Sequence, residues 1–190
     1  MAHNKIIIIT APSGSGKTTL VKRLLSVCPE LAFSVSACTR QPRAGEEHGR
    51  DYYFLDEARF KELIDQDGFA EWEMVYAGKY YGTLRSELDR IWQDGRYPLV
   101  DIDVKGALAI RKQYPDSSLS VFIQAPSPGV LRERLLMRGT ETPESLQERV
   151  DKAAFELSFA PNFDRVIVND DLEAATAELV ALVRKFVKGA

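Results

Sequence analysis

The segment that most constrains the fold joins an aliphatic run to an amphipathic helix through a loop rich in glycine and serine. The run Ile6-Ile7-Ile8-Ile9 is β-branched throughout, so it predicts a buried strand over residues 5–10. Residues 16–26 are predicted to be helical, because their apolar side chains recur on one face. The loop between the strand and the helix reads Ala11-Pro12-Ser13-Gly14-Ser15-Gly16-Lys17-Thr18-Thr19.

This loop has the composition of a phosphate-binding loop. It fits the pattern G-x-x-x-x-G-K-[ST], except that Ala11 occupies the place of the first glycine. Glycines let backbone N–H groups turn toward phosphate oxygens, and the helix that starts here adds the positive end of its dipole. Lys17 would carry charge to the β- and γ-phosphates, and the Thr18 hydroxyl can ligate Mg2+. An ordinary glycine-rich turn is the weaker alternative. We therefore predict that a nucleoside triphosphate binds at Ser13, Gly14, Ser15, Gly16, Lys17, Thr18 and Thr19.

Strand and helix patterns alternate along most of the chain, which predicts an α/β fold with a parallel sheet flanked by helices on both faces. Further strands are predicted at residues 33–38, 97–103, 119–124 and 165–168. Further helices are predicted at residues 56–66, 86–93, 105–113, 127–137, 143–159 and 171–187. Residues 68–82 are aromatic and suggest irregular structure. The alternation fails between about residues 36 and 84, so we predict one domain over 1–190, with a core at 1–35 and 85–190 and an inserted lobe at 36–84.

The composition is that of a protein without strong overall charge. The formal net charge of the 190 residues is −3, so any anion site must be a local concentration of positive charge, and we expect neither a nucleic-acid nor a membrane partner. Two cysteines, Cys28 and Cys38, define no metal site and favour buried free thiols in a reducing compartment. No signal segment precedes the first apolar run, which is too short for a membrane span. We therefore expect a cytoplasmic protein; the oligomeric state is left open.

A second candidate anion site lies in the predicted inserted lobe. Arg40 and Arg43 flank Pro42, and two guanidiniums held near each other repel unless an anion lies between them. A solvated basic loop is the ordinary alternative. An NTPase that only switches has no need of a second anion site, whereas a kinase that acts on a phosphorylated acceptor does. Tyr52 could add a hydroxyl to the grip of the arginines.

Taken together, these segments strongly resemble the guanylate kinase family. The matching motifs follow the order of that family and cover nearly the whole chain. Besides the loop at residues 11–18, they are Phe33-Ser34-Val35-Ser36, Thr39-Arg40-Gln41-Pro42-Arg43-Ala44-Gly45-Glu46, Gly49-Arg50-Asp51-Tyr52, Phe69-Ala70-Glu71-Trp72, Tyr80-Tyr81-Gly82-Thr83, Asp101-Ile102-Asp103, Arg138-Gly139-Thr140-Glu141-Thr142 and Val168-Asn169-Asp170-Asp171. The chain departs from the pattern at Ala11, which the family admits, and at Lys105, where glutamine is common.

The resemblance implies a P-loop NTPase core with an inserted nucleoside-monophosphate-binding lobe and a lid at about residues 138–150. It implies the reaction ATP + GMP ⇌ ADP + GDP with Mg2+, so that ATP and GMP are the small-molecule partners. The GMP phosphate would be held by Arg40, Arg43, Tyr52 and Tyr81, and the guanine would be read by Ser36, Glu71, Thr83 and Asp103. The catalytic residues would be Lys17, Asp101, Arg134, Arg138 and Arg149. Thr18 and Asp101 would lie near the metal, and Asn169 near the ATP purine.

Two of these assignments also follow from residue chemistry. Guanine presents two adjacent N–H donors, which a carboxylate complements, and Glu71 lies in an aromatic stretch where an unpaired carboxylate would be costly. A salt-bridged strand residue is the alternative for Glu71. Asp101 and Asp103 alternate along a predicted strand, so we expect them to face the same side, near Mg2+ and substrate. For Asp103, a helix cap is the alternative.

Two other functions remain open at this point. A kinase for a phosphorylated ribose would use the same loop and arginines, but it would have no need of a carboxylate at Glu71. A non-catalytic module that binds phosphopeptides through the arginines would have no need of an intact phosphate loop, whereas this chain has Gly16-Lys17-Thr18.

Overall fold

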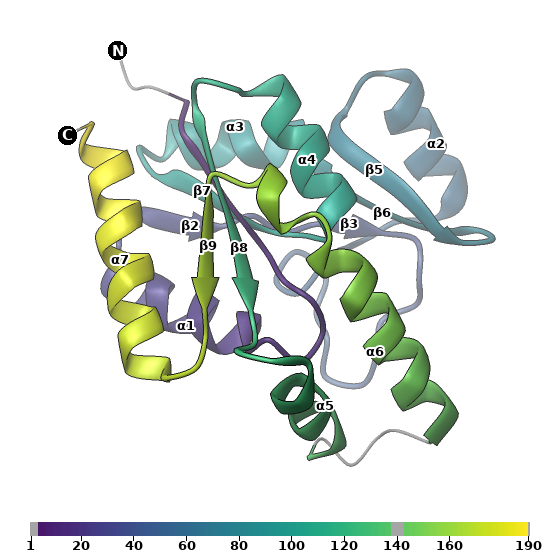
Figure 1. The fold of residues 1–190 in the computed structure, drawn as a ribbon. Coiled ribbons are helices and arrows are strands. Elements are labelled where there is room, and N and C mark those ends of the chain that lie inside the picture. Colours follow the sequence, from purple (N-terminus) through teal and green to yellow (C-terminus); the bar gives the residue numbers. More distant parts are fainter. Residues whose placement is uncertain (1–3, 138–142, 190) are drawn as a thin grey trace.

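The computed structural model describes residues 4–137 and 143–189. Its centre is a parallel sheet of five strands in the order β2-β7-β1-β8-β9 (Figure 1). The strands are β1 (Ile6–Thr10), β2 (Leu31–Phe33), β7 (Tyr97–Asp101), β8 (Ser118–Gln124) and β9 (Arg165–Val168). The predicted α/β class with a parallel sheet between helices is confirmed.

The alternation of side chains along β1 explains why both faces of this sheet are covered. Ile7 and Ile9 are fully buried on one face, in a cluster that includes residues of α1 (Lys17–Val27) and α7 (Leu172–Lys188). Ile6 and Ile8 are fully buried on the other face, with residues of α3 (Arg85–Gln93) and α4 (Val104–Gln113). A β-branched run buried on both faces is typical of a central parallel strand.

Among the described residues between β8 and β9, two further helices and a short 3-10 helix are formed. They are α5 (Pro128–Leu136), α6 (Pro143–Leu157) and η1 (Ala160–Asn162). Ser127 caps α5, because its hydroxyl accepts from the Val130 N–H at 3.2 Å. Within residues 4–137 and 143–189, no helix combines the length and the apolar character that a bilayer span requires.

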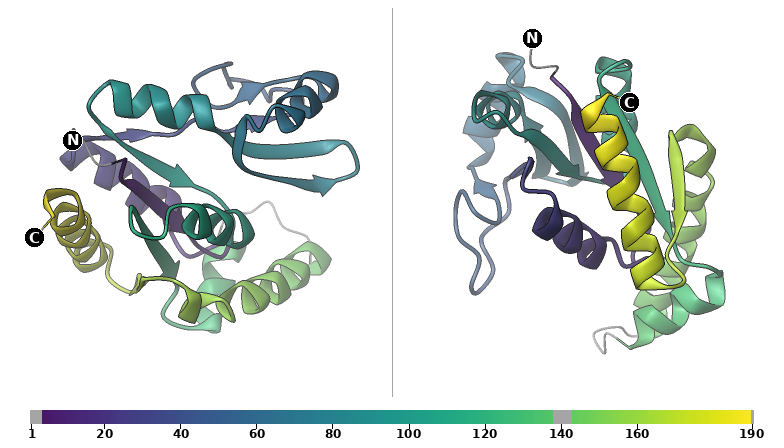
Figure 2. Two further views of the ribbon diagram at one scale, coloured as in Figure 1. Left: turned by 90° about the horizontal axis from the view of Figure 1, so that it is seen from above. Right: turned by 90° about the vertical axis from the view of Figure 1, so that its left-hand side faces the viewer.

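A second sheet, in the order β4-β3-β6-β5, stands beside the core (Figure 2). Its strands are β3 (Ala37–Cys38), β4 (Tyr53–Phe54), β5 (Phe69–Tyr76) and β6 (Lys79–Leu84). One side is covered by α2 (Glu57–Asp65), whose Phe60 is fully buried and stacks on Phe69 at 4.3 Å between ring centroids. Asp56 caps α2 by accepting from the Arg59 N–H at 2.7 Å.

Two sequence-based predictions about this region are wrong. The single strand predicted at 33–38 is two strands in different sheets, because the Ser34 N–H still bonds to Leu99 of the core whereas Ala37 pairs with Gly82. The region 68–82, predicted to be irregular, forms most of an antiparallel hairpin. Its strands β5 and β6 meet at a two-residue turn, Ala77-Gly78, in which Gly78 has a φ of 71°.

Candidate active site

The phosphate loop holds a backbone conformation that requires glycine. Gly14 and Gly16 have φ values of 90° and 88°, in the left-handed region that side chains disfavour. The Asn169 side chain donates to the Ser15 carbonyl at 2.8 Å and lies where a Cβ of Gly16 would be. The loop is therefore held by the residue that follows β9. The N-cap of α1 is Gly16, which has no side chain to cap the N–H groups at the start of the helix. Such an exposed helix N-terminus binds anions.

A cavity of about 630 Å³ opens over this loop. Its described lining residues are Ala11, Pro12, Ser13, Gly14, Gly16, Lys17, Thr18, Asp103, Glu148, Arg149, Lys152 and Glu156. The Arg149 guanidinium donates to the Ser13 hydroxyl at 3.3 Å, so α6 faces the loop across this cavity. We call it the donor cavity.

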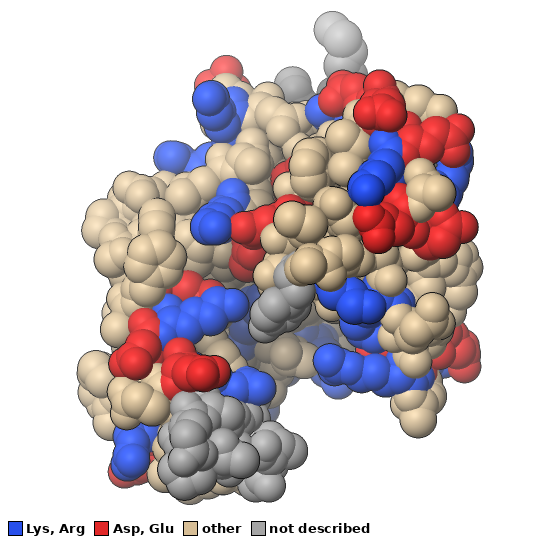
Figure 3. Space-filling model, turned by 90° about the vertical axis from the view of Figure 1, so that its right-hand side faces the viewer, with Lys and Arg blue, Asp and Glu red and all other residues tan. Residues whose placement is uncertain are grey.

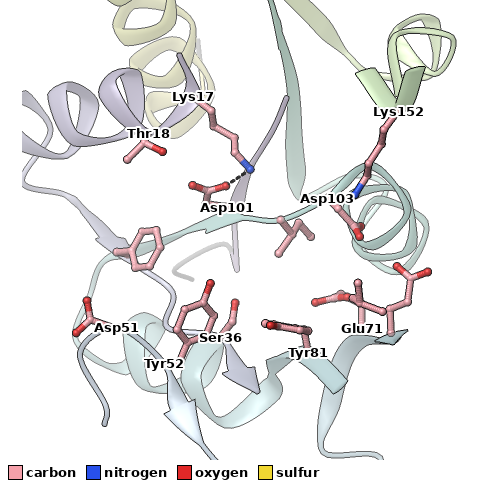
Figure 4. A pocket seen from close by; sticks show the side chains of 15 residues that line it. Lys17, Thr18, Ser36, Asp51, Tyr52, Glu71, Tyr81, Asp101, Asp103 and Lys152 are labelled. Atoms are coloured by element: carbon pink, nitrogen blue, oxygen red, sulfur yellow. Dashed lines mark ion pairs between the residues drawn. The ribbon is translucent and has the colours of Figure 1, made fainter. Parts of the chain in front are cut away.

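A second cavity of about 460 Å³ lies between the two sheets. Its described lining residues are Lys17, Thr18, Phe33, Ser36, Asp51, Tyr52, Glu71, Glu73, Val75, Tyr81, Gly82, Asp101, Ile102, Asp103 and Lys152 (Figure 4). We call it the acceptor cavity. On the face of the molecule that carries α6 and the β5–β6 hairpin, the surface is hollowed near its centre, and Lys and Arg side chains gather around the hollow (Figure 3).

Lys17 and Asp101 meet at the border of the two cavities. Their side chains form an ion pair and are 23% and 18% exposed (Figure 4). Lys17 begins α1 and Asp101 ends β7, so the pair joins the carboxyl ends of neighbouring parallel strands. In doubly wound folds this edge of the sheet is where ligands bind. Thr18, also predicted as a metal ligand, lines the same border.

Glu71 enters the acceptor cavity from β5. The hydroxyl of Thr83, opposite it on β6, donates to its carboxylate at 2.7 Å. The pKa of Glu71 is raised to about 7, mainly by burial; the Thr83 hydrogen bond opposes the rise, and the negative charge of Asp103 contributes to it. A carboxylate shielded from water, with one hydroxyl partner, can accept further N–H donors from a ligand.

Ser36, Tyr52 and Tyr81 line the same cavity as Glu71, although they come from three separate segments. The rings of Tyr52 and Tyr81 meet edge to face, with centroids 6.2 Å apart. The structure thus brings together most of the side chains that the resemblance assigned to the acceptor.

Arg40 and Arg43 are not among the described lining residues of the acceptor cavity. Arg40 is bound by Glu46 through two hydrogen bonds of 2.6 and 2.7 Å, and it lies 4.8 Å from the centroid of the Tyr52 ring. The same carboxylate accepts from the Arg43 N–H at 2.8 Å, and these bonds lower the pKa of Glu46 to about 2. In this structure the Glu46 carboxylate is therefore the anion that lies between the two arginines.

The prediction that Asp101 and Asp103 lie on one strand is also wrong. Strand β7 ends at Asp101, and Asp103 is the N-cap of α4, where it accepts from the Gly106 N–H at 2.8 Å. Asp103 nevertheless lines both cavities, so the helix cap and the cavity position are combined in one side chain.

The remaining residues of the predicted site lie away from the two cavities or outside the described residues. Arg134 donates to the Asn169 carbonyl at 3.0 Å, and neither residue is among those described as lining the two cavities. Thr19 is exposed on α1. Arg138 lies outside the described residues, as does the part of the predicted lid at 138–142.

The sequence analysis missed several residues in or beside the site, among them Lys152, Glu156 and Glu87. Lys152 and Glu156 of α6 line the donor cavity, and their spacing from Arg149, three and seven residues, is that of one helix face. Glu87, only 2% exposed, accepts from the Val35 N–H at 3.2 Å and from the Tyr53 hydroxyl at 3.0 Å. It thereby supports the segments that carry Ser36 and Tyr52. A charged residue buried at the start of a helix has no local sequence signature.

A parallel core with a phosphate loop, beside a second cavity lined by a carboxylate and hydroxyls, defines the class of P-loop kinases. Shikimate kinase from Bacteroides thetaiotaomicron shares the fold, with a TM-score of 0.53 and 18% identity over 95% of this chain and 98% of that one. The crystal structure of guanylate kinase from Anaplasma phagocytophilum is more similar, with a TM-score of 0.75 and 30% identity over 97% of this chain and 86% of that one.

Sequence comparisons define the family. The model of the guanylate kinase family matches residues 3–186. The guanylate kinase of Chlorobium chlorochromatii is 48% identical over 183 residues, which cover 96% of each chain. That of Bacteroides fragilis is 46% identical over 183 residues, which cover 96% of this chain and 90% of that protein. The chain belongs to the guanylate kinase family, and the fold, the family and the enzyme class predicted from the sequence are confirmed.

Proposed function

We propose that this chain transfers the γ-phosphoryl group of ATP to GMP, with the ATP phosphates in the donor cavity and GMP in the acceptor cavity. The observation that carries the assignment of the cavities is the Glu71–Thr83 pair. It holds a carboxylate in a cavity that borders the phosphate loop, through the hydroxyl of Thr83, which is fully buried behind it. Guanine offers the complementary groups, because N1–H and N2–H2 are adjacent donors.

In this arrangement Glu71 accepts from both guanine donors, while Ser36, Thr83 and Asp103 complete the reading of the base. Tyr52 and Tyr81 donate to the GMP phosphate from the wall of the cavity. Arg40 lies behind Tyr52 and is bound to Glu46. If Arg40 exchanges Glu46 for the GMP phosphate, it adds a positive charge to the phosphate site. Arg43 reaches the same phosphate from the exposed loop. Arginine suits this task because its planar fork binds phosphate through two bonds.

For the donor, the N–H groups around Gly14 and Gly16 hold the phosphates, and Lys17 neutralises their charge. Asn169 acts by holding the loop in shape, and Arg134 in turn holds Asn169, so we assign both residues positioning roles. Arg149 and Arg138 approach the transferred group from the predicted lid. Transfer then depends on alignment and charge neutralisation, because the GMP phosphate is already anionic and needs no general base.

The residues at the border fit Mg2+. Thr18 and Asp101 supply one hydroxyl and one carboxylate to the same cavity, and Mg2+ in kinases usually takes one or two protein oxygens beside phosphates and waters. Bound there, Mg2+ would neutralise charge on the β- and γ-phosphates. Release of Asp101 from Lys17 would free both side chains for their ligands.

We further propose that residues 36–84 and the predicted lid move as units that close over the substrates and keep water from the γ-phosphate. A cytoplasmic location is part of the proposal, and it is supported by the two cysteines, which are free and buried.

The test is a panel of acceptors offered to wild type and to Glu71→Gln. With ATP and Mg2+, the wild type should release ADP with GMP, but not with AMP, other nucleoside monophosphates or ribose bisphosphate. Glu71→Gln keeps the shape of the side chain and loses two charge-assisted bonds, so kcat/KM for GMP should fall by roughly 10²- to 10⁴-fold. The preference for GMP over AMP should shrink as well. An unaltered GMP-to-AMP ratio in a folded Glu71→Gln would contradict the role of Glu71.

A further inference from the structure

Helix α6 places a lysine, which the roles above do not use, between the donor and acceptor cavities. Among the described residues, those that line both cavities are Lys17, Thr18, Asp103 and Lys152. Lys17 and Lys152 are therefore the two cations of this shared border in the part of the chain that the structure describes. The phosphoryl group has to cross that border to pass from ATP to GMP.

The acceptor cavity carries an excess of negative charge, so a second cation there matters for the binding of phosphates. Its described lining carries five carboxylates, Asp51, Glu71, Glu73, Asp101 and Asp103, against two ammonium groups. One of these, on Lys17, is engaged by Asp101. The phosphates that meet at this border bring several further negative charges. A cation aimed at the border stabilises them where they converge, in a site from which water is partly excluded.

The geometry of α6 aims Lys152 at this place. Arg149 and Lys152 are three residues apart and share a helix face, and Arg149 reaches the phosphate loop at the Ser13 hydroxyl, at 3.3 Å. The side chain of Lys152 points from α6 toward Asp103, the residue that caps α4 on the other side of the border (Figure 4). Its ammonium lies 3.8 Å from the Glu156 carboxylate, one turn further along α6.

The Lys152–Glu156 pair also indicates that the lysine is held near the border and not tightly bound elsewhere. Glu156 is 14% exposed at its side chain, whereas Lys152 is 70% exposed, and the contact of 3.8 Å is at the upper limit for an ion pair. Burial raises the pKa of Glu156, and the nearby charges of Lys152 and Lys17 oppose the rise. A loose pair within a helix contributes little to stability. The Lys152 ammonium can therefore leave Glu156 and bind a phosphate at a small cost in free energy.

We propose that Lys152 is a further catalytic residue of this enzyme, which contacts the phosphoryl group during its transfer from ATP to GMP. This inference rests on the proposed function. The contact differs from that of Lys17, because Lys152 comes from α6 and approaches the transferred group from the side opposite the phosphate loop. It joins Arg149 on the same helix face, so that α6 carries two cations toward the reacting phosphates.

The chain offers a matched control for the ordinary alternative of a solvated helix lysine. Lys61 of α2 is 55% exposed and pairs with Glu57 one turn away at 2.7 Å, as Lys152 pairs with Glu156. Lys61 lines neither of the two cavities. Lys61→Met and Lys152→Met therefore each remove a pair between side chains four residues apart on a helix, and only the second removes a cation from the border.

The experiment compares wild type, Lys152→Met, Lys152→Arg and Lys61→Met in steady-state kinetics and in calorimetry. The calorimetric probes are ATP alone, GMP alone, and a bridged analogue in which adenosine and guanosine are joined through five phosphates. For Lys152→Met we expect a roughly 10- to 100-fold loss of kcat and a similar loss of affinity for the bridged analogue, as for one charge-assisted contact. Affinities for ATP alone and GMP alone should change little. Lys152→Arg should retain most of the activity, and Lys61→Met should match wild type.

Each other result overturns the proposal. If Lys152→Met keeps wild-type kcat and bridged-analogue affinity, Lys152 is a solvated lysine. If Lys152→Met and Lys152→Arg lose activity equally, with lowered melting temperatures, the residue is structural. A wild type that forms no GDP from GMP would overturn the proposed function and this inference together. An active wild type beside an unaffected Lys152→Met would overturn this inference alone.

Discussion

The carboxylate of Glu71 packs directly against the backbone of Gly106 in the first turn of α4. A Cβ on Gly106 would come within 2.8 Å of Oε2 and 3.1 Å of Cδ of Glu71. The Glu71 carboxylate thus occupies space that exists because position 106 has no side chain. This contact joins the second sheet to the core at the acceptor cavity.

Gly106→Ala should impair GMP use with little effect on folding. The methyl group meets the far end of a flexible side chain, so Glu71 can move aside, but it then leaves Thr83 and the guanine position. We expect kcat/KM for GMP to fall by roughly 10- to 100-fold, as for the loss of one or two charge-assisted bonds. Calorimetry with ATP should show no change. Gly129→Ala is the control, because the nearest atom to its Cβ would be 3.7 Å away; equal kinetics for the two alanine variants would contradict the prediction.

The pKa of Glu71 predicts a pH dependence of GMP binding. Guanine donates to the carboxylate form, so protonation of a group with a pKa of about 7 competes with GMP. Below pH 7, kcat/KM for GMP should fall toward tenfold per pH unit in wild type, and it should level off above about pH 8. Glu71→Gln should lack this slope and keep the one due to the GMP phosphate, whose pKa is near 6. Parallel pH profiles for the two proteins would contradict the assignment.

The raised pKa of Glu71 also makes the stability of the protein without GMP depend on pH. The folded protein binds the Glu71 proton more tightly than the unfolded chain does, since its pKa is raised from 4.5 to about 7. The stabilising contribution is therefore complete below pH 4.5 and is lost as the pH rises through 7. The melting temperature of wild type relative to Glu71→Gln should decrease between pH 5 and pH 8, as measured by calorimetric melting of both proteins.

Arg40→Ala should weaken GMP and spare ATP. The loss of charge-assisted bonds to the GMP phosphate is worth about 1.5–3 kcal/mol, so the apparent GMP affinity should fall roughly 10- to 100-fold. Arg43→Ala should act in the same direction. Arg59→Ala is a matched control, because Arg59 also pairs with a glutamate, Glu62, at 2.6 Å, but on the exposed surface of α2. If ATP affinity collapses and GMP affinity does not, the lobe arginines serve the donor.

Lys17→Ala should abolish phosphoryl transfer in a folded protein. Charge neutralisation at the β- and γ-phosphates is worth at least ~3 kcal/mol, more than about a hundredfold in rate. Asp101 would also lose its partner, so a change in melting temperature is expected to be small but measurable. Lys22→Ala, an exposed lysine on the same helix, should behave as wild type. Near-normal turnover in Lys17→Ala would overturn the phosphate-loop assignment.

Much of the core could be predicted from the sequence because its signals are local. The phosphate loop requires left-handed glycines at fixed positions between a strand and a helix, and Gly14 and Gly16 satisfy that requirement within a few residues of chain. The alternation of strand and helix patterns was likewise sufficient for the parallel sheet. Caps such as Asp56 and Ser127 depend on contacts three residues away, which the sequence shows directly.

What the sequence could not decide depends on contacts between distant segments. Residues 33–38 have strand propensity throughout, and only pairing with Leu99 on one side and Gly82 on the other assigns them to two sheets. The approach of Glu71 to Gly106 and the place of Lys152 between two cavities result from the packing of whole elements. Propensity and periodicity describe a residue and its near neighbours, whereas these relationships are set by the burial of apolar faces across the entire fold.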